Sequence, residues 1–396
     1  AAAARAAAAK PHPPRTDPQE THGKKQSRPA NTAGRPVSFL WIFLDRGSEG
    51  QYHKKLGIAL SPKNLTKKGF SILHAFHMLK NRFFCPSAGT EQEDIMKQAV
   101  IDIGSNSMRL TVYETTETGG FTILFKDKVM AGLAGYVEDG ALSLDGIARA
   151  VLGLMSFRNT LEALNITQVS VFATASLRNI TNTTQAVSTI QRATGFSIEV
   201  ISGEEEARYG YAGAMEELDL SDGLFVDIGG ASTEVVRFAD RQLITANSCP
   251  VGSLKLYRDW VKKILPNREA IQNMEHAIQQ AMEGVIHQSV PQGLPLVCVG
   301  GTSRAALKLA KRVCHLPESA NRISIQQLQQ VCAALCASQK AAADLILKVE
   351  PERIHTMIPG LLILRHIVEG FGAGEMIVSQ YGAREGYLCQ KIRKAS

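Results

Sequence analysis

The sequence of 396 residues lacks any long hydrophobic run, and no stretch approaches the roughly 18 continuous apolar residues of a transmembrane helix. It has no HxH or HExxH spacing among its histidines and no CxxC pair among its seven cysteines, so a zinc site is not expected. Cys332 and Cys336 stand one helical turn apart without a neighbouring Cys or His, and they are interpreted as buried structural thiols. The odd number of scattered cysteines favours a reducing, cytoplasmic compartment over a disulfide scaffold.

Net charge is also nearly absent from most of the chain. Residues 1–95 contain 15 Lys and Arg against 7 Asp and Glu, a balance of +8, while the whole chain has +7. Residues 96–396 therefore sum to −1. The basic composition describes the leader rather than the main body, and it gives no reason to expect a nucleic-acid or membrane partner.

The first 95 residues form a basic leader without sustained hydrophobic periodicity. Residues 1–9 are nearly all alanine and residues 11–33 are rich in Pro, Thr, Gln, Asn and Lys, which predicts a largely disordered extension. The apolar run 37–44 is too short to span a bilayer and poorly placed for a signal peptide, whereas residues 69–84 fit one amphipathic helix. We interpret the leader as a basic tail, a targeting segment or a consequence of start-site choice, and expect the functional module to begin at Met96.

The sequence contains one strand–turn motif twice. Residues 100–107 (VIDIGSNS) and 226–234 (VDIGGASTE) are each an apolar strand ending in Asp, followed by a turn of glycine and hydroxyl residues and then more strand-type sequence. A third glycine turn, 299–302 (VGGT), follows another apolar run and opens a helical stretch. The backbone N–H groups of such turns can hold phosphate oxygens, and the carboxylate can hold a cation. The repeat therefore predicts two similar half-domains facing one phosphate-rich ligand.

Alternating strand and helix patterns run through both halves. In the first half we expect helices at 144–164, 182–194 and 204–218, and strands at 98–103, 108–114, 121–129, 168–174 and 197–201. In the second half we expect helices from about 253 onward, including 302–311, 325–349, 358–370 and 383–394, and strands at 224–228, 233–238, 242–248, 294–299 and 375–379. This pattern predicts an α/β fold of two domains, residues 96–220 and 221–396, with a boundary near 219–223 and an interdomain cleft.

Five motifs, in order, resemble those of the exopolyphosphatase/guanosine-pentaphosphate phosphatase family: 101–107 (IDIGSNS), 173–178 (ATASLR), 203–208 (GEEEAR), 227–234 (DIGGASTE) and 300–302 (GGT). The resemblance continues through 358–360 (IPG) and 379–386 (SQYGAREG), so it covers residues 96 to about 390. It implies two actin-like (ribonuclease H-like) domains with mixed sheets. We expect the short two-domain form, because the chain ends soon after Gly386. A homodimer is a further expectation from the family.

Three positions depart from the family pattern. Ala231 stands in place of a third glycine in the second turn, Arg109 stands where some relatives have His, and His355 stands where many have Asp. These differences bear on chain-length preference and ion binding rather than on the class of reaction.

Hydrolysis of a phosphoanhydride needs neutralised phosphate charge, a positioned water and a carboxylate that orients or deprotonates that water. A single glycine turn is ordinarily a chain reversal, but three of them on matching strand ends favour phosphate binding. The expected phosphate ligands are Gly104, Ser105, Asn106, Ser107, Arg178, Gly229, Gly230, Ser232, Thr233, Gly300, Gly301 and Thr302. Asp102 and Asp227 are expected to hold Mg²⁺ mainly through water. A helix or turn cap is the alternative for each, and the place of Asp227 at a strand end before the second turn favours the metal.

Two glutamates are the candidate catalytic residues. The resemblance places the family's catalytic Glu at Glu206, whereas the acids at 204–206 also fit the preference of a helix N-terminus for negative charge. Glu234 is an unusual choice for a buried strand beside Val235 and Val236, and it is expected to orient water or help bind metal. Two carboxylates that face one water beside anionic phosphate would raise the pKa of one of them, as suits a general base.

The evidence for Lys and Arg residues as phosphate ligands is weaker. The planar guanidinium of Arg178 suits two phosphate oxygens, but without the resemblance a surface salt bridge fits about equally well. Arg109 and Lys255 are weaker candidates for holding the chain beyond the scissile bond, and Arg208 is spaced to pair with Glu204.

These observations and the resemblance together predict a Mg²⁺-dependent phosphohydrolase that removes terminal phosphate from inorganic polyphosphate. The closest alternative is hydrolysis of the γ-phosphate of guanosine pentaphosphate in the same site. Two others are an ATP-dependent kinase of the same superfold and a regulatory protein that binds polyphosphate or guanosine penta- or tetraphosphate without hydrolysis. A nucleobase needs an apolar slot and polyphosphate needs a basic groove, and the sequence alone places neither.

Overall fold

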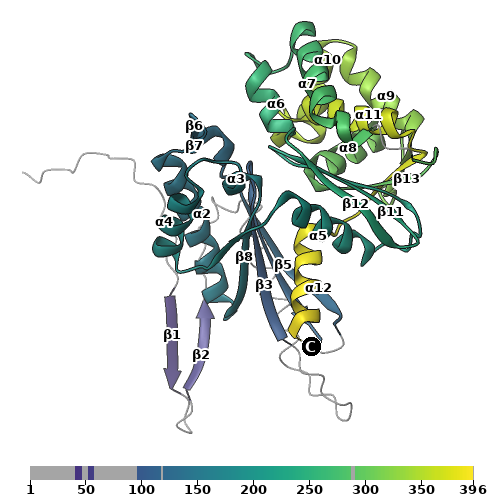
Figure 1. Ribbon diagram of the computed structural model, residues 1–396. Helices are drawn as coiled ribbons and strands as arrows, with labels where there is room; N and C mark the ends of the chain where they lie inside the picture. The colour runs from purple at the N-terminus through teal and green to yellow at the C-terminus, as the bar shows by residue number, and fades with distance from the viewer. Residues whose placement is uncertain (1–40, 47–51, 58–95, 117–118, 287–289, 396) are drawn as a thin grey trace, which may run out of the picture. The chain divides into compact units, whose positions relative to one another are not determined.

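The computed structural model describes residues 41–46, 52–57, 96–116, 119–286 and 290–395 (Figure 1). The chain divides into two compact units, residues 1–83 and 84–396. In the first unit, β1 (Trp41–Arg46) pairs antiparallel with β2 (Tyr52–Gly57). The segment expected to be disordered, 11–33, and the helix expected at 69–84 lie outside the described residues.

The second unit begins with a five-stranded mixed sheet in the order β5-β4-β3-β8-β9. Its strands are β3 (Met96–Ile103), β4 (Met108–Thr115), β5 (Phe121–Val129), β8 (Gln168–Ala173) and β9 (Ile198–Val200). The first three form an antiparallel meander, and β8 and β9 extend the sheet in parallel from β3. Apolar stripes of α2 (Leu144–Ala163) and α4 (Thr183–Thr194) pack on one face of this sheet and form its core.

The second sheet repeats this arrangement. Its six strands run in the order β12-β11-β10-β13-β15-β14. They are β10 (Gly223–Ile228), β11 (Thr233–Ala239), β12 (Gln242–Cys249), β13 (Pro295–Val299), β14 (Arg322–Ser324) and β15 (Glu375–Val378). Again three strands form an antiparallel meander and the next two extend it in parallel. The predicted α/β fold with two duplicated mixed sheets is therefore confirmed, although β14 was not predicted.

Helices of the second half cover the outer face of its sheet (Figure 1). They are α6 (Ser253–Trp260), α7 (Arg268–Ile286), α8 (Gly300–Val313), α9 (Ile325–Cys336), α10 (Gln339–Val349) and α11 (Met357–Phe371). The segment expected to be helical over 325–349 is two helices, because the Ser338 side chain accepts a hydrogen bond from the Ala341 amide and starts a new one. Outside the predicted elements lie the short helix α3 (Ala175–Arg178) and the single turn η2 (Pro351–Arg353).

Two helices line the inner faces of the sheets. α5 (Gly203–Met215) packs Ala207 and Tyr211 on the second sheet, and α12 (Ala383–Ala395) packs Tyr387 on the first. Figure 1 shows α12 beside α5. The two helices cross with their backbones in contact, since a Cβ on Gly213 would lie 2.8 Å from the Gly386 amide nitrogen. The end of the chain thus returns to the first sheet, while the domain boundary near 219–223 stays a prediction.

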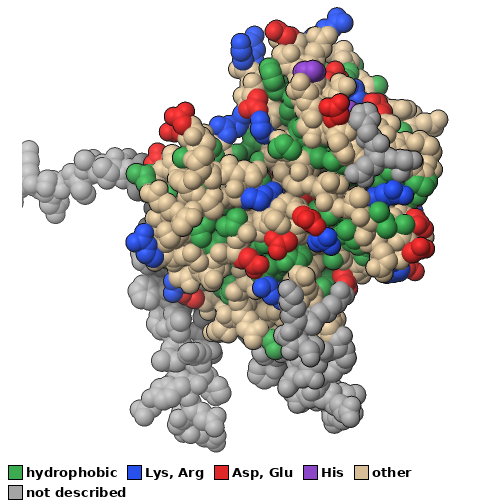
Figure 2. All heavy atoms as spheres, in the orientation of Figure 1, with side chains coloured by type: hydrophobic (Ala, Val, Ile, Leu, Met, Phe, Trp, Pro, Cys, Tyr) green, Lys and Arg blue, Asp and Glu red, His purple; other side chains and the backbone are tan. Residues whose placement is uncertain are grey.

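The surface of the described residues carries both signs of charge. On the face shown in Figure 2, Lys and Arg side chains alternate with Asp and Glu rather than forming one continuous basic area. This agrees with the charge of −1 counted for residues 96–396. Among the described residues, no helix combines the length and the apolar character needed to cross a membrane.

Candidate active site

The first turn (104–107) and the second turn (229–233) lie against each other. β3 and β10 are equivalent strands, and Asp102 and Asp227 occupy the same position in each, one residue before the end. A Cβ placed on Gly230 would lie 3.4 Å from Cβ of Ser105 and 3.7 Å from Cβ of Asn106. The structure therefore brings together two turns that are more than a hundred residues apart in the chain.

The third turn (300–302) packs directly on Asp227. Gly300 has a φ of +81°, a left-handed backbone that favours glycine, and a Cβ there would collide with the Asp227 carboxylate. α8 begins at this residue, so the N–H groups of its first turn, which lack helical partners, lie beside the carboxylate. Gly301 lines a cavity that adjoins the turns. The buried Thr302 packs against Gly360 of α11 and does not line this cavity.

The polar side chains of the turns have different partners. Asn106 and Ser107 line the cavity. The Thr233 hydroxyl donates a hydrogen bond of 2.6 Å to the Val251 carbonyl, and Ser232 is buried and hydrogen-bonds Glu234. These two hydroxyls therefore hold the second turn and its glutamate in place rather than facing the cavity. The other expected phosphate ligands of these two turns flank the cavity without lining it: Gly104, Ser105, Gly229 and Gly230.

The two candidate catalytic glutamates lie where α5 meets the second sheet, with Glu234 buried and Glu206 half-buried. Glu206 lies in the first turn of α5, and its Oε2 accepts a hydrogen bond of 2.9 Å from Nη1 of Arg178. Arg178 also donates to the Ile201 carbonyl at 3.1 Å, which fixes the guanidinium at the end of α3. Glu234 is only 1% exposed, lies opposite Asp227 in the β10–β11 register and accepts a hydrogen bond of 2.8 Å from the Ser248 hydroxyl.

The environment of these glutamates favours their protonated forms. Burial, and then the charge of Glu234, raises the pKa of Glu206 well above its usual range, although Arg178 opposes the shift. Burial, and then the charge of Asp227, raises the pKa of Glu234 to about 7. Glu206 and Glu234 thus form a coupled pair that can take up and release a proton near neutral pH, as a general base must.

Asp102 and Asp227 form a second pair of carboxylates. Burial raises the pKa of both, while the charge of Arg109 lowers both. The charge of Asp227 further raises the pKa of Asp102. Within the part of the chain that the structure describes, no group of three or more His, Cys, Asp or Glu side chains is placed to hold a metal ion. Two carboxylates beside glycine turns fit a hard cation that keeps most of its water, which is the usual behaviour of Mg²⁺.

A cavity of about 240 Å³ adjoins these turns and is lined by residues of both halves. We refer to it as the basic cavity, because its charged side chains are five cations and two carboxylates: Arg109, Lys128, Arg304, Lys308 and Arg353, with Glu350 and Glu352. Its lining also includes Asn106, Ser107 and Gly301, so it opens directly onto the first and third turns. The arrangement joins backbone donors and positive charge at one place.

Three arginines of the basic cavity form no ion pair with a carboxylate among the described residues, although the charge of Asp227 acts on all three. Arg109, Arg304 and Arg353 are half-buried, and none of them forms an ion pair or a side-chain hydrogen bond with another described residue. Burial, and then the charge of Arg109, lowers the pKa of Arg304 to about 10, and the same two causes lower that of Arg353. Partly buried cations that repel one another are costly unless an anion neutralises them. The basic cavity is therefore suited to an anionic ligand.

Sequence reasoning missed most of these cations. Arg109 is only a weak candidate by sequence, and no motif includes Arg304, Arg353, Lys128 or Lys308. Arg304 offered a signal, because it lies one turn into the helix that begins at the third turn. Lys128 on β5 and Arg353 on η2 offered none, since they stand outside every motif and meet only in the folded chain.

The remaining sequence candidates lie elsewhere. Lys255 pairs with Asp259 at 2.6 Å within α6, and Arg208 pairs with Glu204 at 2.6 Å, as its spacing indicates. His355 is exposed and its ring lies 4.8 Å from that of Tyr257. None of these residues lines the basic cavity.

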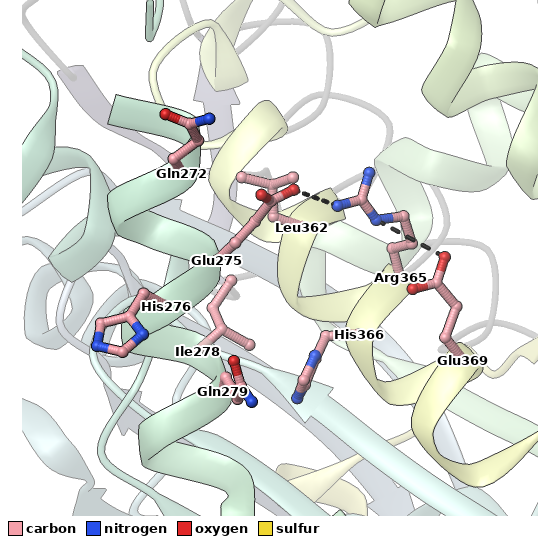
Figure 3. A pocket seen from close by; sticks show the side chains of 9 residues that line it. All are labelled: Gln272, Glu275, His276, Ile278, Gln279, Leu362, Arg365, His366 and Glu369. Atoms are coloured by element: carbon pink, nitrogen blue, oxygen red, sulfur yellow. Dashed lines mark hydrogen bonds and ion pairs between the residues drawn. The ribbon is translucent and has the colours of Figure 1, made fainter. Parts of the chain in front are cut away.

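A larger cavity of about 420 Å³ lies between α7 and α11 (Figure 3). Figure 3 shows Arg365 between two carboxylates, and its guanidinium pairs with Glu275 and, at 3.8 Å, with Glu369. This cavity shares no residue with the three turns, and the positive charge of Arg365 is already neutralised. It therefore offers no place for phosphate chemistry.

Replacing Glu234 with Gln is expected to stabilise the folded protein at neutral pH. The folded pKa of Glu234, about 7, lies above its usual value of 4.5, so stability is lost as the pH rises from about 4 to above 7. The amide cannot ionise but still accepts the Ser248 hydrogen bond, so the variant should gain up to about 3 kcal/mol at pH 8 and nothing at pH 4. Urea unfolding at both pH values checks this. Glu375→Gln, which breaks an exposed ion pair with Arg322, is the control, and a less stable Glu234→Gln protein at pH 8 would contradict the expectation.

Duplicated mixed sheets, facing glycine turns, buried carboxylates and a basic cavity define an actin-like protein that acts on phosphate groups. A model of the Ppx/GppA phosphatase family matches residues 111–395, which is more than half of the chain. The chain therefore belongs to the Ppx/GppA phosphatase family.

Solved structures agree with this assignment. The Aquifex aeolicus member of the Ppx/GppA family is 25% identical, with 76% of this chain and 99% of that chain covered and a TM-score of 0.63. An exopolyphosphatase from Cytophaga hutchinsonii is 20% identical, with 76% and 98% covered and a TM-score of 0.68. At 20% identity, the likeness to the Cytophaga hutchinsonii structure shows a shared fold.

Proposed function

We propose that the protein is an exopolyphosphatase, which hydrolyses the terminal phosphoanhydride bond of inorganic polyphosphate with Mg²⁺ and releases orthophosphate. The observation that carries the proposal is the set of half-buried arginines that form no ion pair among the described residues, Arg109, Arg304 and Arg353, beside the first and third turns. Polyphosphate is a chain of anions with no apolar part, and the basic cavity offers cations rather than an apolar slot for a nucleobase. The name of the Cytophaga hutchinsonii structure points to the same substrate.

In the proposed reaction a water attacks the terminal phosphorus in line with the leaving oxygen. Glu206 and Glu234 orient this water, and the pair accepts its proton as the new P–O bond forms. The bond from phosphorus to the bridging oxygen breaks, so one orthophosphate leaves and the chain is shorter by one unit. Arg178 holds the Glu206 carboxylate in place through the 2.9 Å hydrogen bond, and we therefore assign it a positioning role as well as the phosphate contact expected from the sequence.

Charge on the transferred phosphate is neutralised from three sides in this scheme. The N–H groups of the turns face the phosphate, and the arginines of the basic cavity contact the phosphates that follow. Asp102 and Asp227 would hold Mg²⁺ mainly through water, and the cation would add positive charge at the scissile group.

The test measures orthophosphate release by the full chain from tripolyphosphate and from long-chain polyphosphate, with Mg²⁺ and with excess EDTA. Guanosine pentaphosphate is assayed in parallel. We expect Mg²⁺-dependent release from polyphosphate, with a kcat/KM that exceeds the value for guanosine pentaphosphate. Faster hydrolysis of guanosine pentaphosphate would replace polyphosphate as the substrate, and binding of either compound without release would make the protein a regulator.

A further inference from the structure

The basic cavity has an inner and an outer part. The inner part holds the half-buried Arg109, Arg304 and Arg353 beside the first and third turns. The outer part holds two lysines whose side chains remain largely in solvent, with exposed fractions of 43% for Lys128 and 57% for Lys308. Exposure therefore orders the cations from the turns towards the mouth of the cavity.

The two parts differ in whether their cations have partners. Lys128 Nζ lies 2.5 Å from Oε2 of Glu352, and Lys308 Nζ lies 2.5 Å from Oε2 of Glu350. Both carboxylates line the cavity with the lysines that they neutralise. The hydrogen bond from Lys128 also holds the pKa of Glu352 below its usual range, so this carboxylate stays charged.

The backbone separates the two signs of charge within one short element. In η2, which begins at Pro351, Glu352 is exposed and pairs with Lys128, whereas the next residue, Arg353, is half-buried and lies against Gly301 of the third turn. Glu350 directly precedes η2 and is only partly exposed. The charges of Glu350 and Glu352 also act on Arg353, since both oppose the lowering of its pKa, so the two carboxylates border the inner arginines.

We propose that Glu350 and Glu352 determine substrate length, because they limit the basic cavity to a short phosphate chain. The inference rests on the proposed function. A short chain such as tripolyphosphate places its phosphates on the inner arginines. The continuation of a longer chain meets neutralised lysines and two carboxylates, which repel it. The protein is accordingly specific for short oligophosphates over long-chain polyphosphate.

The test is the double variant Glu350→Gln/Glu352→Gln, with each single variant beside it. Glutamine keeps the size of both side chains, removes two negative charges and leaves Lys128 and Lys308 available to phosphate. We expect the ratio of kcat/KM for long-chain polyphosphate to that for tripolyphosphate to rise at least about fivefold through KM.

A second readout is the salt dependence of long-chain binding. Each additional phosphate contact releases counterions, so log(kcat/KM) for long chains should fall more steeply with log[KCl] in the double variant, with the slope increased by about one to two. Glu375→Gln, which breaks an exposed ion pair remote from the cavity, should alter neither the ratio nor the slope.

The possible results separate the inference from the proposed function. An unchanged or lower ratio in the double variant overturns the inference, as does an equal loss of kcat on both substrates. A wild-type protein that releases no phosphate from either chain overturns the proposed function instead. A graded rise in the ratio, from single variants to double variant, supports the assignment.

Discussion

Glu206→Gln is expected to lower kcat for phosphate release from tripolyphosphate by about a thousandfold, which is within the usual contribution of a general base. The amide is close in size to the carboxylate and can still accept the hydrogen bond from Arg178, so the site should keep its shape. It cannot accept the proton of the attacking water. KM should therefore change less than about threefold, since the arginines and turns that hold phosphate are untouched. Steady-state release of orthophosphate at saturating and subsaturating substrate separates the two constants.

The matched control is Glu204→Gln, two residues earlier in the same turn of α5. Its carboxylate is exposed and pairs only with Arg208 among the described residues, so activity should stay within twofold of the wild type. An equal loss in both variants would mean that the first turn of α5 acts through helix stability. An active Glu206→Gln enzyme would remove Glu206 from the mechanism.

The same pair of glutamates predicts a pH profile. The pKa of Glu234 is raised to about 7 and that of Glu206 is raised well above its usual range, so the pair carries an extra proton in acid. A base must lose that proton before it can accept one from water. The wild-type kcat/KM should therefore rise with pH up to a plateau above an apparent pKa near 7, a value that belongs to the coupled pair rather than to one residue.

The sequence alone was sufficient to predict the three turns and the strands of the two large sheets except β14. Each turn combines an apolar strand with glycine at a fixed spacing, and both signals are local. The duplication was visible for the same reason, because 100–107 and 226–234 repeat one pattern. What local signals could not show is that Gly230 lies against Ser105, since that contact depends on how the two sheets meet through α5 and α12.

The partners of individual side chains were beyond sequence reasoning. Thr233 and Thr302 belong to phosphate-type motifs, yet the first donates to the Val251 carbonyl and the second packs against Gly360. The hydroxyl that a motif places near a ligand can equally well support the turn, and only its hydrogen bonds decide between the two. Arg353 shows the opposite case, because it belongs to no motif and still lies against Gly301.

Arg304→Gln is expected to raise KM for tripolyphosphate by about ten- to a hundredfold, because a hydrogen bond between charged groups contributes about 1.5–3 kcal/mol. The same change should leave stability unchanged or improve it. Arg304 forms no ion pair among the described residues, and burial and then the charge of Arg109 lower its pKa to about 10 although the charge of Asp227 opposes the shift, so the net effect of this charge on the folded protein is unfavourable. The substitution therefore separates binding from folding. Substrate titrations and urea unfolding of one protein preparation measure both effects.

Arg312→Gln provides the comparison, because this arginine lies near the end of the same helix, α8, and is exposed outside the basic cavity. It should change neither KM nor the free energy of unfolding. Substitution of an arginine that supports the fold would lower both stability and activity. Substitution of an arginine that binds anions lowers the affinity for substrate and raises the free energy of unfolding. If Arg304→Gln unfolds at lower urea concentration than the wild type and keeps its KM, then the half-buried charge supports the fold. In that case the basic cavity is not where polyphosphate binds.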